Sequence, residues 1–318
     1  MIDWQKTAFL FPGQGSQQVG MGKAIAEAFS AAKAIFDEAD RVFDVPFSRL
    51  LFEGPEDELN MTYNTQPALF VTSIAVLAAL KSVYGEDIQP AMVAGHSLGE
   101  ITSLVVAEAI RFEDGLRLVR ERARLMGVAG EKSPGAMAAI LGLEVETLTQ
   151  ICQEASEKVG RPVVVANDNC PGQIVISGDR AALEHALELC KAAGARRVLP
   201  LAVSVAAHSP LMAESAQQFR ETILAATPIH PPKIPVIGNA NADFLPTPEI
   251  IRHELGIQIT SPVRWTETMQ LMLKHGISTF LEIGSKSVLC GLLKRIDRNA
   301  VCIVIEKPED IHQLSTIS

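Results

Sequence analysis

A serine between two glycines is the feature of this sequence best suited to chemistry. Gly95, Ser97 and Gly99 form a G-x-S-x-G pattern, with an apolar run at 91–93 before it and a helix-like apolar run from Ile101 after it. In that context the pattern is typical of a nucleophile elbow, a sharp turn that lifts a serine hydroxyl out of a sheet. Free N–H groups at the helix start could face a developing negative charge. We therefore predict Ser97 as a nucleophile; the alternative is a serine that only caps a helix.

A serine nucleophile needs a general base, and histidine titrates in the useful range. His96 adjoins Ser97 in the turn, where neighbouring side chains point apart. His208 stands where the chain passes from one folded unit to another, so its ring could face a cleft. We favour His208 as the base and expect a backbone carbonyl to fix its tautomer, because no acidic residue is clearly placed to do so. The other histidines lie in helical, proline-rich or terminal settings: His185, His230, His253, His275 and His312.

Apolar runs and turn-forming residues define the elements that must position these side chains. Residues 7–11 predict a buried strand, which ends in a turn rich in glycine and amides at 12–17. The elbow is expected to supply a second strand and the helix after it. Helical spacing predicts helices over 20–42, 66–84 and 111–130, and an otherwise irregular segment at 45–63 with a short helix near 56–59.

The spacing pattern changes at Gly135. From there the predicted order is strand, helix, strand, strand, helix, strand, which is the ferredoxin-like split βαβ arrangement. The strands are expected at 136–140, 162–167, 173–177 and 195–201, and the helices at 145–158 and 179–193, with Asp179 as an N-cap.

Elements of a larger α/β unit lie on both sides of this segment. We therefore predict that 134–202 is an insertion into one large domain formed by 1–133 and 203–318. The second half of the large domain is expected to contain helices over 209–226, 248–255, 265–275 and 287–296, and strands at 236–238, 278–283 and 301–305.

Composition and charge exclude several classes of protein. The 318 residues are 47% hydrophobic and 20% charged, which is typical of a folded chain rather than a disordered one. A net charge of −9 disfavours non-specific binding to nucleic acid or anionic membranes. The longest apolar stretch, 68–80, is too short to span a bilayer, and the first residues do not resemble a signal peptide. We expect a cytoplasmic protein.

The five cysteines are scattered, odd in number and without C-x-x-C spacing. This pattern fits a reducing compartment and argues against a zinc site or a disulfide framework. We expect each to be a buried structural thiol, and no metal to be bound. The residues are Cys152, Cys170, Cys190, Cys290 and Cys302.

Short motifs along the whole chain resemble those of one family, in the same order. The motifs are FPGQGSQ at 11–17, TQPA at 65–68, GHSLGE at 95–100, RxxLM at 122–126, NxNxPGQ at 167–173, HSPLM at 208–212, PVRW at 262–265 after Gln258, and EIG at 282–284. The chain thus resembles the malonyl-CoA:acyl carrier protein transacylases of fatty-acid synthesis and the acyltransferase domains of polyketide synthases. That resemblance implies an α/β-hydrolase-like domain with a ferredoxin-like insert. Each motif is weak alone, whereas the ordered set is specific.

The resemblance implies roles in catalysis. Ser97 would attack the thioester of malonyl-CoA, and His208 would take its proton and return it to the leaving thiolate. The backbone N–H groups of Gln14 and Leu98 would form the oxyanion hole, where neighbouring glycines allow close approach of the backbone. The malonyl group would then pass from Ser97 to the phosphopantetheine thiol of acyl carrier protein, so the kinetics would be ping-pong.

The resemblance also implies substrate-binding residues. Arg122 would pair with the free malonyl carboxylate, Gln258 would orient the histidine through its backbone carbonyl, and Asn167 would contact substrate. The alternatives are a solvated arginine, a polar cap and an asparagine that shapes a hairpin. Leu98 after the serine resembles the malonyl-type members of the family, whereas the small Ala207 before the histidine does not block a branched group. We therefore expect malonyl to be preferred with some transfer of methylmalonyl.

The acceptor of such an enzyme is acidic, which calls for basic residues beside the cleft. We expect no cofactor and a monomer. The candidate docking residues, each of which could instead be an ordinary surface charge, are Lys286, Lys294 and Arg295 near the last helix, and Lys191, Arg196 and Arg197 on the insert.

Three other functions stay open. A trans-acting acyltransferase of a polyketide synthase would carry the same motifs. A serine esterase or lipase would need a histidine near the C-terminus, where only His275 and His312 are available, and would have no use for Arg122. A non-catalytic carrier-protein scaffold would not need Ser97 or His208.

Overall fold

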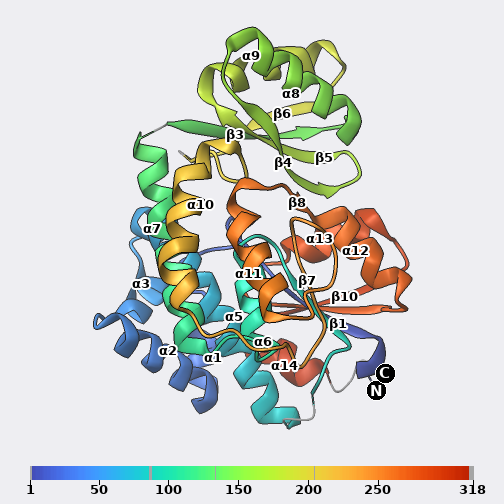
Figure 1. Cartoon of the computed structure of the whole chain (residues 1–318). Coiled ribbons are helices and arrows are strands. Elements are labelled where there is room, and N and C mark those ends of the chain that lie inside the picture. Colours follow the sequence, from blue (N-terminus) through green and yellow to red (C-terminus); the bar gives the residue numbers. More distant parts are fainter. Residues whose placement is uncertain (1, 86–87, 133, 204, 315–318) are drawn as a thin grey trace.

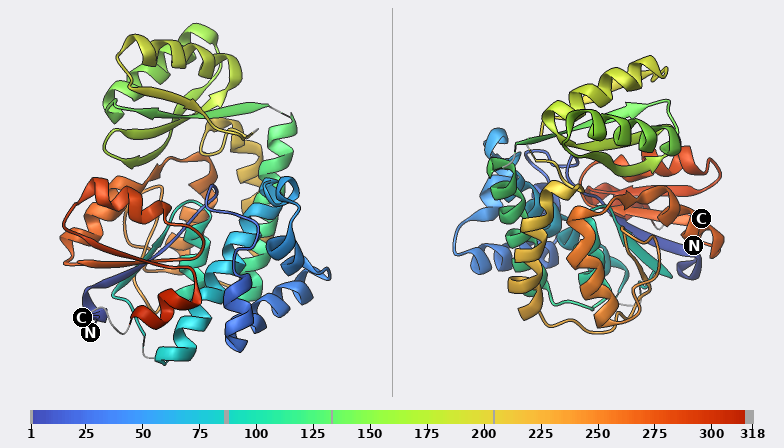
Figure 2. Two further views of the ribbon diagram at one scale, coloured as in Figure 1. Left: turned by 180° about the vertical axis from the view of Figure 1, so that it is seen from behind. Right: turned by 45° about the horizontal axis from the view of Figure 1, so that its top comes forward.

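Two sheets organise the molecule, one in each of two stacked α/β units (Figure 1). The computed structural model describes residues 2–85, 88–132, 134–203 and 205–314. The small unit rests on one end of the large unit and is joined to it by the end of α7 and by the segment before α10 (Figure 2). This arrangement confirms the α/β class with a ferredoxin-like insert.

The large sheet is parallel throughout the described chain, with strand order β10-β9-β1-β2-β7. Its central strands are continuous apolar runs because helices cover both faces of such a sheet. All their carboxyl ends lie at one edge, where open α/β sheets bind ligands. The strands are β1 (Thr7–Phe11), β2 (Met92–Gly95), β7 (Val236–Ile237), β9 (Thr279–Ile283) and β10 (Val301–Ile305).

The helices of the first 132 residues include one that the sequence did not predict. The expected helix over 20–42 is two helices, because Phe29 takes an extended conformation between them. The expected irregular segment contains a further helix, α3. The elements are α1 (Lys23–Ala28), α2 (Ser30–Phe43), α3 (Phe47–Glu53), α4 (Glu56–Leu59), α5 (Thr62–Tyr84), α6 (Gly99–Val106) and α7 (Phe112–Lys132).

Helix α5 is long and apolar enough to cross a membrane by length and composition. However, 72% of its most apolar window is buried inside the fold, where it packs against α2 and α7. Its weak amphipathicity therefore reflects a helix surrounded by protein. The helix predicted over 66–84 is confirmed, and it begins four residues earlier, at Thr62.

The small unit has the strand order β6-β3-β5-β4 with antiparallel neighbours, which is the ferredoxin-like order. Its two helices cover the outer face, away from the large unit (Figure 1). Asp179 caps α9, as predicted, by accepting the N–H groups of Ala181 and Ala182. The elements are β3 (Gly135–Leu141), α8 (Val145–Val159), β4 (Val163–Cys170), β5 (Gln173–Asp179), α9 (Arg180–Ala192) and β6 (Arg197–Pro200).

A strand from the large unit extends this small sheet. Strand β8 (Val263–Arg264) pairs in parallel with Asn167 and Asp168 of β4. The predicted boundaries of the insert, 134 and 202, remain a prediction, and the adjoining residues 133 and 204 lie outside the described residues.

The C-terminal half contains less regular helices than its sequence pattern predicts. The expected helix over 209–226 consists of a 3-10 turn, a short α-helix and a π-helical turn at Arg220–Leu224. A final helix, α14, was not predicted. The elements are η2 (Pro210–Met212), α10 (Ala213–Phe219), α11 (Pro248–Ile257), η4 (Gln258–Thr260), α12 (Trp265–Lys274), α13 (Val288–Ile296) and α14 (Pro308–Gln313).

The prediction of five free thiols is wrong for two cysteines. Cys290 of α13 and Cys302 of β10 form a disulfide. Their sequence spacing gave no signal, because the pairing depends on a helix and a strand that the fold places side by side. Cys152, Cys170 and Cys190 are free and buried, as expected.

Candidate active site

Ser97 lies at the carboxyl end of β2, in a turn that only glycine neighbours permit. Ser97 has a left-handed backbone with φ of 53°. A Cβ on Gly95 would lie 1.9 Å from the carbonyl of Gly99, so the turn can close only without that side chain. Helix α6 begins directly after the turn. The G-x-S-x-G pattern therefore forms the strand, turn and helix of a nucleophile elbow.

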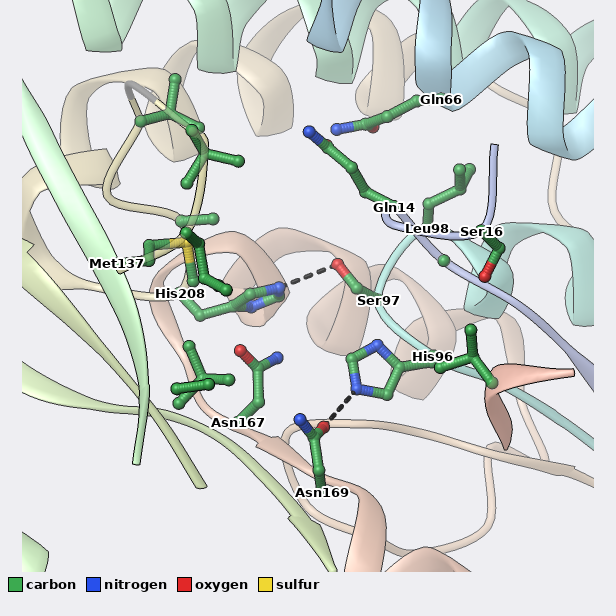
Figure 3. A pocket seen from close by; sticks show the side chains of 18 of the residues that line it. Gln14, Ser16, Gln66, His96, Ser97, Leu98, Met137, Asn167, Asn169 and His208 are labelled. Atoms are coloured by element: carbon green, nitrogen blue, oxygen red, sulfur yellow. Dashed lines mark hydrogen bonds between the residues drawn. The ribbon is translucent and has the colours of Figure 1, made fainter. Parts of the chain in front are cut away.

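His208 meets the serine from the segment after the small unit. Its Nε2 lies 2.8 Å from Ser97 Oγ (Figure 3). Its Nδ1 lies 2.9 Å from the carbonyl oxygen of Gln258 and 3.0 Å from that of Ser261. Both partners are acceptors, so Nδ1 carries the proton and Nε2 is free to accept one from the serine.

The surroundings keep this imidazole neutral. Burial, followed by the positive charge of Arg122, lowers the pKa of His208 to about 3. The backbone N–H of His208 also donates to the carbonyl of Ile259 at 3.0 Å. The ring is therefore held through both of its nitrogens. At neutral pH it is uncharged, with a proton on Nδ1 only, as a general base requires.

Arg122 is buried beside the serine, and none of its hydrogen bonds among the described residues goes to a carboxylate, although the buried carboxyl of Glu100 lies close enough to act on its charge. Its Nη1 donates to Gln66 Oε1 at 2.6 Å, and its Nη2 donates to Gln258 Oε1 at 2.8 Å and to Ser97 Oγ at 3.0 Å. Its Nε has no partner within the described chain. Burial lowers the pKa of Arg122 to about 10, so the group still carries its charge at neutral pH. A buried guanidinium whose hydrogen bonds all go to neutral groups has donor capacity left to bind an anion.

Two residues that line the cavity around Ser97 have backbone N–H groups without a protein acceptor among the described residues. They are Gln14, which follows β1, and Leu98, which precedes α6. The turn after β1 packs closely against the backbone of the elbow. A Cβ on Gly13 would lie only 2.5 Å from the carbonyl oxygen of His96, so this position needs glycine. Both groups are thus available to an oxyanion.

The cavity has a volume of about 330 Å³ and lies between the two units. Its polar side carries Ser97, His208 and Arg122 from the large unit. Its apolar side is formed by β3 and β5, by the segment that returns to the large unit, and by α13. The apolar lining residues are Met126, Met137, Ala139, Val175, Leu201, Val203, Val205, Ala207, Val288, Leu289 and Leu292.

His96 lines the same cavity but has no hydrogen bond to Ser97 or His208 among those of the described residues. Its Nε2 lies 2.8 Å from Oδ1 of Asn169 (Figure 3), and its ring packs against Trp265 at 5.4 Å. Burial lowers its pKa. Asn167, predicted to bind substrate, lines the same cavity and is 5% exposed. The sequence analysis thus chose the histidine that lies beside the serine.

Two groups that complete this arrangement were not predicted from the sequence. Gln66 of α5 holds the guanidinium of Arg122; the TQPA motif at 65–68 contained it, but no chemistry was assigned to it. The carbonyl of Ser261 shares the imidazole proton of His208, and no sequence pattern marks a backbone acceptor. No group of three or more potential metal ligands occurs among the described residues.

Comparison with known proteins agrees with this geometry. Residues 8–305 match the acyl transferase domain family. The malonyl CoA-acyl carrier protein transacylase of Bacillus subtilis is 46% identical over 306 residues, covering 96% of this chain and 95% of the relative. The protein of the same name from Escherichia coli K12 is 40% identical over 301 residues, covering 95% and 96%. This chain belongs to the acyl transferase family.

Solved structures of such acyl transferases share the whole fold. An acyl carrier protein S-malonyltransferase from Vibrio cholerae superposes with a TM-score of 0.93 at 41% identity, covering 97% of this chain and 99% of that one. A malonyl-transacylase in complex with a type II PKS acyl-carrier protein has a TM-score of 0.93 at 40% identity, covering 97% and 98%. The arrangement of the large and small units is therefore shared with these acyl transferases.

Proposed function

We propose that this acyl transferase moves a malonyl group from malonyl-CoA to the phosphopantetheine thiol of acyl carrier protein. The observation that carries the proposal is the pairing of Ser97 and His208 at 2.8 Å beside a buried guanidinium whose hydrogen bonds, among the described residues, all go to neutral groups. A simple esterase has no use for such a charge. The names of the relatives support the same donor and acceptor.

In the first half of the proposed reaction Ser97 Oγ attacks the thioester carbonyl carbon while His208 Nε2 accepts the hydroxyl proton. The carbonyl oxygen becomes an oxyanion, which the N–H groups of Gln14 and Leu98 stabilise. When the intermediate collapses, the C–S bond breaks, and the imidazolium protonates the leaving CoA thiolate. The malonyl group is then an ester on Ser97 and His208 is neutral again.

The second half runs in reverse with a different thiol. His208 accepts the proton of the phosphopantetheine thiol, whose sulfur attacks the malonyl ester. The C–O bond to Ser97 breaks, and the serine oxygen takes the proton back from His208. Donor and acceptor use one cavity in turn, so the kinetics are ping-pong.

Arg122 binds the free carboxylate of the malonyl group in this proposal. Its unpartnered Nε and its remaining N–H groups can meet two carboxylate oxygens, which suits a planar guanidinium better than a lysine. Gln258 orients His208 through its carbonyl and Arg122 through its side chain. Asn167 contacts the substrate from β4.

The apolar side of the cavity bears on the choice of acyl group. Ala207 and Val205 leave room beside the catalytic pair, so a methyl branch can be admitted. Leu98, which also lines the cavity, is typical of malonyl-type relatives, so we expect malonyl to be preferred and methylmalonyl to be transferred more slowly. Competition between the two CoA esters tests this, and equal values of kcat/KM would contradict it.

The acceptor is expected to dock beside α13. Val288 lines the cavity and is 42% exposed, and Lys286 and Lys294 flank it in sequence. Arg295 suits this role less well than the sequence suggested, because it donates to Gln173 Oε1 and to the carbonyl of Pro171. We expect Lys286→Glu with Lys294→Glu to raise KM for the carrier protein by about 10-fold and to leave acylation by malonyl-CoA unchanged.

The basic residues of the insert offer a second docking patch. Charge reversal of Lys191, Arg196 and Arg197 tests it in the same assay. The pair of variants separates the two patches, and an unchanged KM in both would reject the docking proposal. In this proposal the enzyme acts in the cytoplasm as a monomer and needs no cofactor.

The carrier protein could serve fatty-acid or polyketide synthesis. A polyketide carrier is the second candidate because one structural relative is complexed with a type II PKS acyl-carrier protein. Discharge of the malonyl enzyme by each class of carrier protein, compared at equal concentration, separates the two.

The deciding experiment is the mass of the intact protein after brief mixing with malonyl-CoA, beside acetyl-CoA and a Ser97→Ala control. We expect a malonyl adduct that the variant lacks and that carrier protein bearing phosphopantetheine removes, whereas carrier protein without that group does not. An adduct that water alone clears quickly would indicate a hydrolase. No adduct with either CoA ester would favour a scaffold.

A further inference from the structure

Asn239 forms hydrogen bonds with the turn that carries Ser97, from a position just after β7, the strand next to β2. It follows β7 and is fully buried. Its Oδ1 accepts the backbone N–H of Ser97 at 2.6 Å, and its Nδ2 donates to the carbonyl of Gly95 at 2.8 Å. The amide orientation is fixed, because a backbone N–H can only donate and a carbonyl can only accept. One side chain thus bridges both sides of the turn that carries the nucleophile.

The backbone of Asn239 is held as firmly as its side chain. Its N–H donates to Oε2 of Glu100, in the first turn of α6, at 2.7 Å. Its carbonyl accepts the N–H of Arg264, in β8, at 2.9 Å. All the hydrogen-bonding groups of this residue are therefore occupied, and they connect the elbow, its helix and β8.

The other polar group of the Ser97 backbone is also tied. The carbonyl of Ser97 accepts Nε2 of Gln258 at 2.8 Å and the N–H of Glu100 at 3.1 Å. Asn239 occupies the N–H of Ser97, whereas the next N–H at the helix start, that of Leu98, has no acceptor among the described residues. The left-handed φ of 53° at Ser97 is unfavourable for a residue with a side chain and needs such support.

We propose that Asn239 is a positioning residue, whose amide holds Ser97 in the left-handed conformation that aims Oγ at His208. This inference rests on the proposed role of Ser97 as the nucleophile. Asn239 does not line the cavity, so it acts through the turn and not through the substrate.

The variant that tests this is Asn239→Asp, which preserves shape. A protonated carboxyl can still accept from Ser97 and donate to Gly95, whereas a carboxylate repels the Gly95 carbonyl. The activity of this variant should therefore fall as pH rises. The introduced carboxyl would lie beside two buried carboxyls that the Asn239 backbone contacts, Glu100 from α6 and Glu254 from α11. The buried charge of Arg122 from α7 acts on Glu100, and Arg264 of β8 meets Asn239 only through its backbone N–H.

The neighbouring groups keep the introduced carboxyl protonated at mildly acidic pH. Burial, and then Glu254, raise the pKa of Glu100 well above its usual range, and burial raises the pKa of Glu254. A further carboxyl in that place experiences the same burial and the same like charges. The wild-type rate should vary little over this range, because His208 stays neutral.

The experiment measures the single-turnover acylation rate constant with malonyl-CoA between pH 5.5 and 8. For Asn239→Asp we expect a loss of about 100-fold at pH 8, within the range for a misplaced reacting group, and recovery to within about 5-fold of wild type at pH 5.5. The malonyl-CoA concentration at half-saturation should not change. The matched control is Asn241→Asp, which adds a carboxyl beside Glu254 without touching the turn and should retain the wild-type rate.

A fluorophosphonate probe separates this proposal from the proposed function. The probe reports the reactivity of the serine regardless of the acyl group, so a wild type that reacts with it but not with malonyl-CoA would overturn the function alone. Acylation of Asn239→Asp within 3-fold of wild type at pH 8 would overturn the positioning role. So would a loss that is equal at both pH values, or a variant that is unfolded at pH 8, because Asn239 would then serve stability only.

Discussion

Ser97 and His208 bring their side chains to 2.8 Å from backbones that are both left-handed, with φ of 53° and 58°. Such conformations cost about 1–3 kcal/mol each in residues with side chains and persist only where the surroundings enforce them. Around Ser97 the enforcing groups are Asn239 and Gln258. Around His208 they are the carbonyls of Ile259 and Ser261. The catalytic geometry is therefore present before substrate binds.

Arg122 should decide which acyl group is transferred. We expect Arg122→Ala to lower kcat/KM for malonyl-CoA by about 100-fold, because a charge-assisted hydrogen-bond pair to the carboxylate is lost. Acetyl-CoA lacks that carboxylate, so its kcat/KM should change much less. Arg122→Lys keeps the charge without the planar fork and should fall in between. A parallel loss with both esters, measured in one transfer assay, would show that Arg122 serves only the serine.

The acylation rate should not show the usual histidine inflection. The pKa of His208 is lowered to about 3, so the base is unprotonated from about pH 5 to 8 and the rate constant stays level. Rapid mixing followed by mass measurement gives this profile. An inflection near the ordinary histidine value of about 6.5 would contradict the burial argument.

The same shift affects stability in a fixed direction. In the unfolded chain this histidine takes up a proton near its ordinary pKa of about 6.5, whereas in the folded protein it does so only near pH 3. The unfolded state therefore binds more protons in that range, and the free energy of unfolding should decrease as pH falls from about 6.5 toward 3. Urea unfolding of His208→Gln beside wild type isolates this contribution.

Glu282 should give stability the opposite pH dependence. This buried carboxyl accepts the N–H groups of Leu289 and Cys290 at the start of α13, and burial raises its pKa to about 7. Because the folded state holds the proton more tightly than the unfolded one, the stability from this group is full below about pH 4.5 and is lost as pH rises through 7.

Urea unfolding at pH 5 and pH 8 checks this expectation. Glu282→Gln cannot titrate, so wild type should lose free energy of unfolding relative to this variant between the two pH values. Glu309→Gln, an exposed position in α14, is the control and should follow wild type. An identical pH dependence in wild type and Glu282→Gln would contradict the assignment.

The disulfide can be counted directly. Denatured but unreduced protein should show three reactive thiols, and reduced protein should show five. Cys302→Ser should add Cys290 to the three without reduction. In the native state the remaining thiols should react slowly, because burial raises the pKa of Cys152 to about 12 and that of Cys190 to about 11. Five thiols without reduction would mean that the bond does not form.

The sequence was a good guide where a residue acts through local structure. The elbow at Ser97, the Asp179 cap and the long core helix each depend on neighbours a few residues away, so spacing and breakers revealed them. His208, the predicted base, lies beside Ser97 as expected from its position after the insert, where the chain re-enters the large unit. The order of strands in the insert followed from the same patterns.

The sequence was a poor guide where a contact joins distant segments. Asn239 reaches Ser97 across 142 residues, and Gln66 reaches Arg122 across 56, so no periodicity links them. The Cys290–Cys302 bond and the β8–β4 pairing likewise depend on how finished elements lie together. The break at Phe29 and the π-helical turn at Arg220–Leu224 are local, but helical spacing continues through both and hides them.

The pairing of β8 with β4 has a consequence for engineering. The segment that contributes β8 also contains the Gln258 and Ser261 carbonyls that hold His208. A chimera that exchanges only 134–202 would pair a β4 from another protein with the β8 of this one. A poor match at that pairing would displace the carbonyls that hold His208, in addition to changing the residues that line the cavity. An exchange that carries 258–264 together with the insert would keep that edge matched. Subdomain swapping in this protein is therefore a two-segment operation.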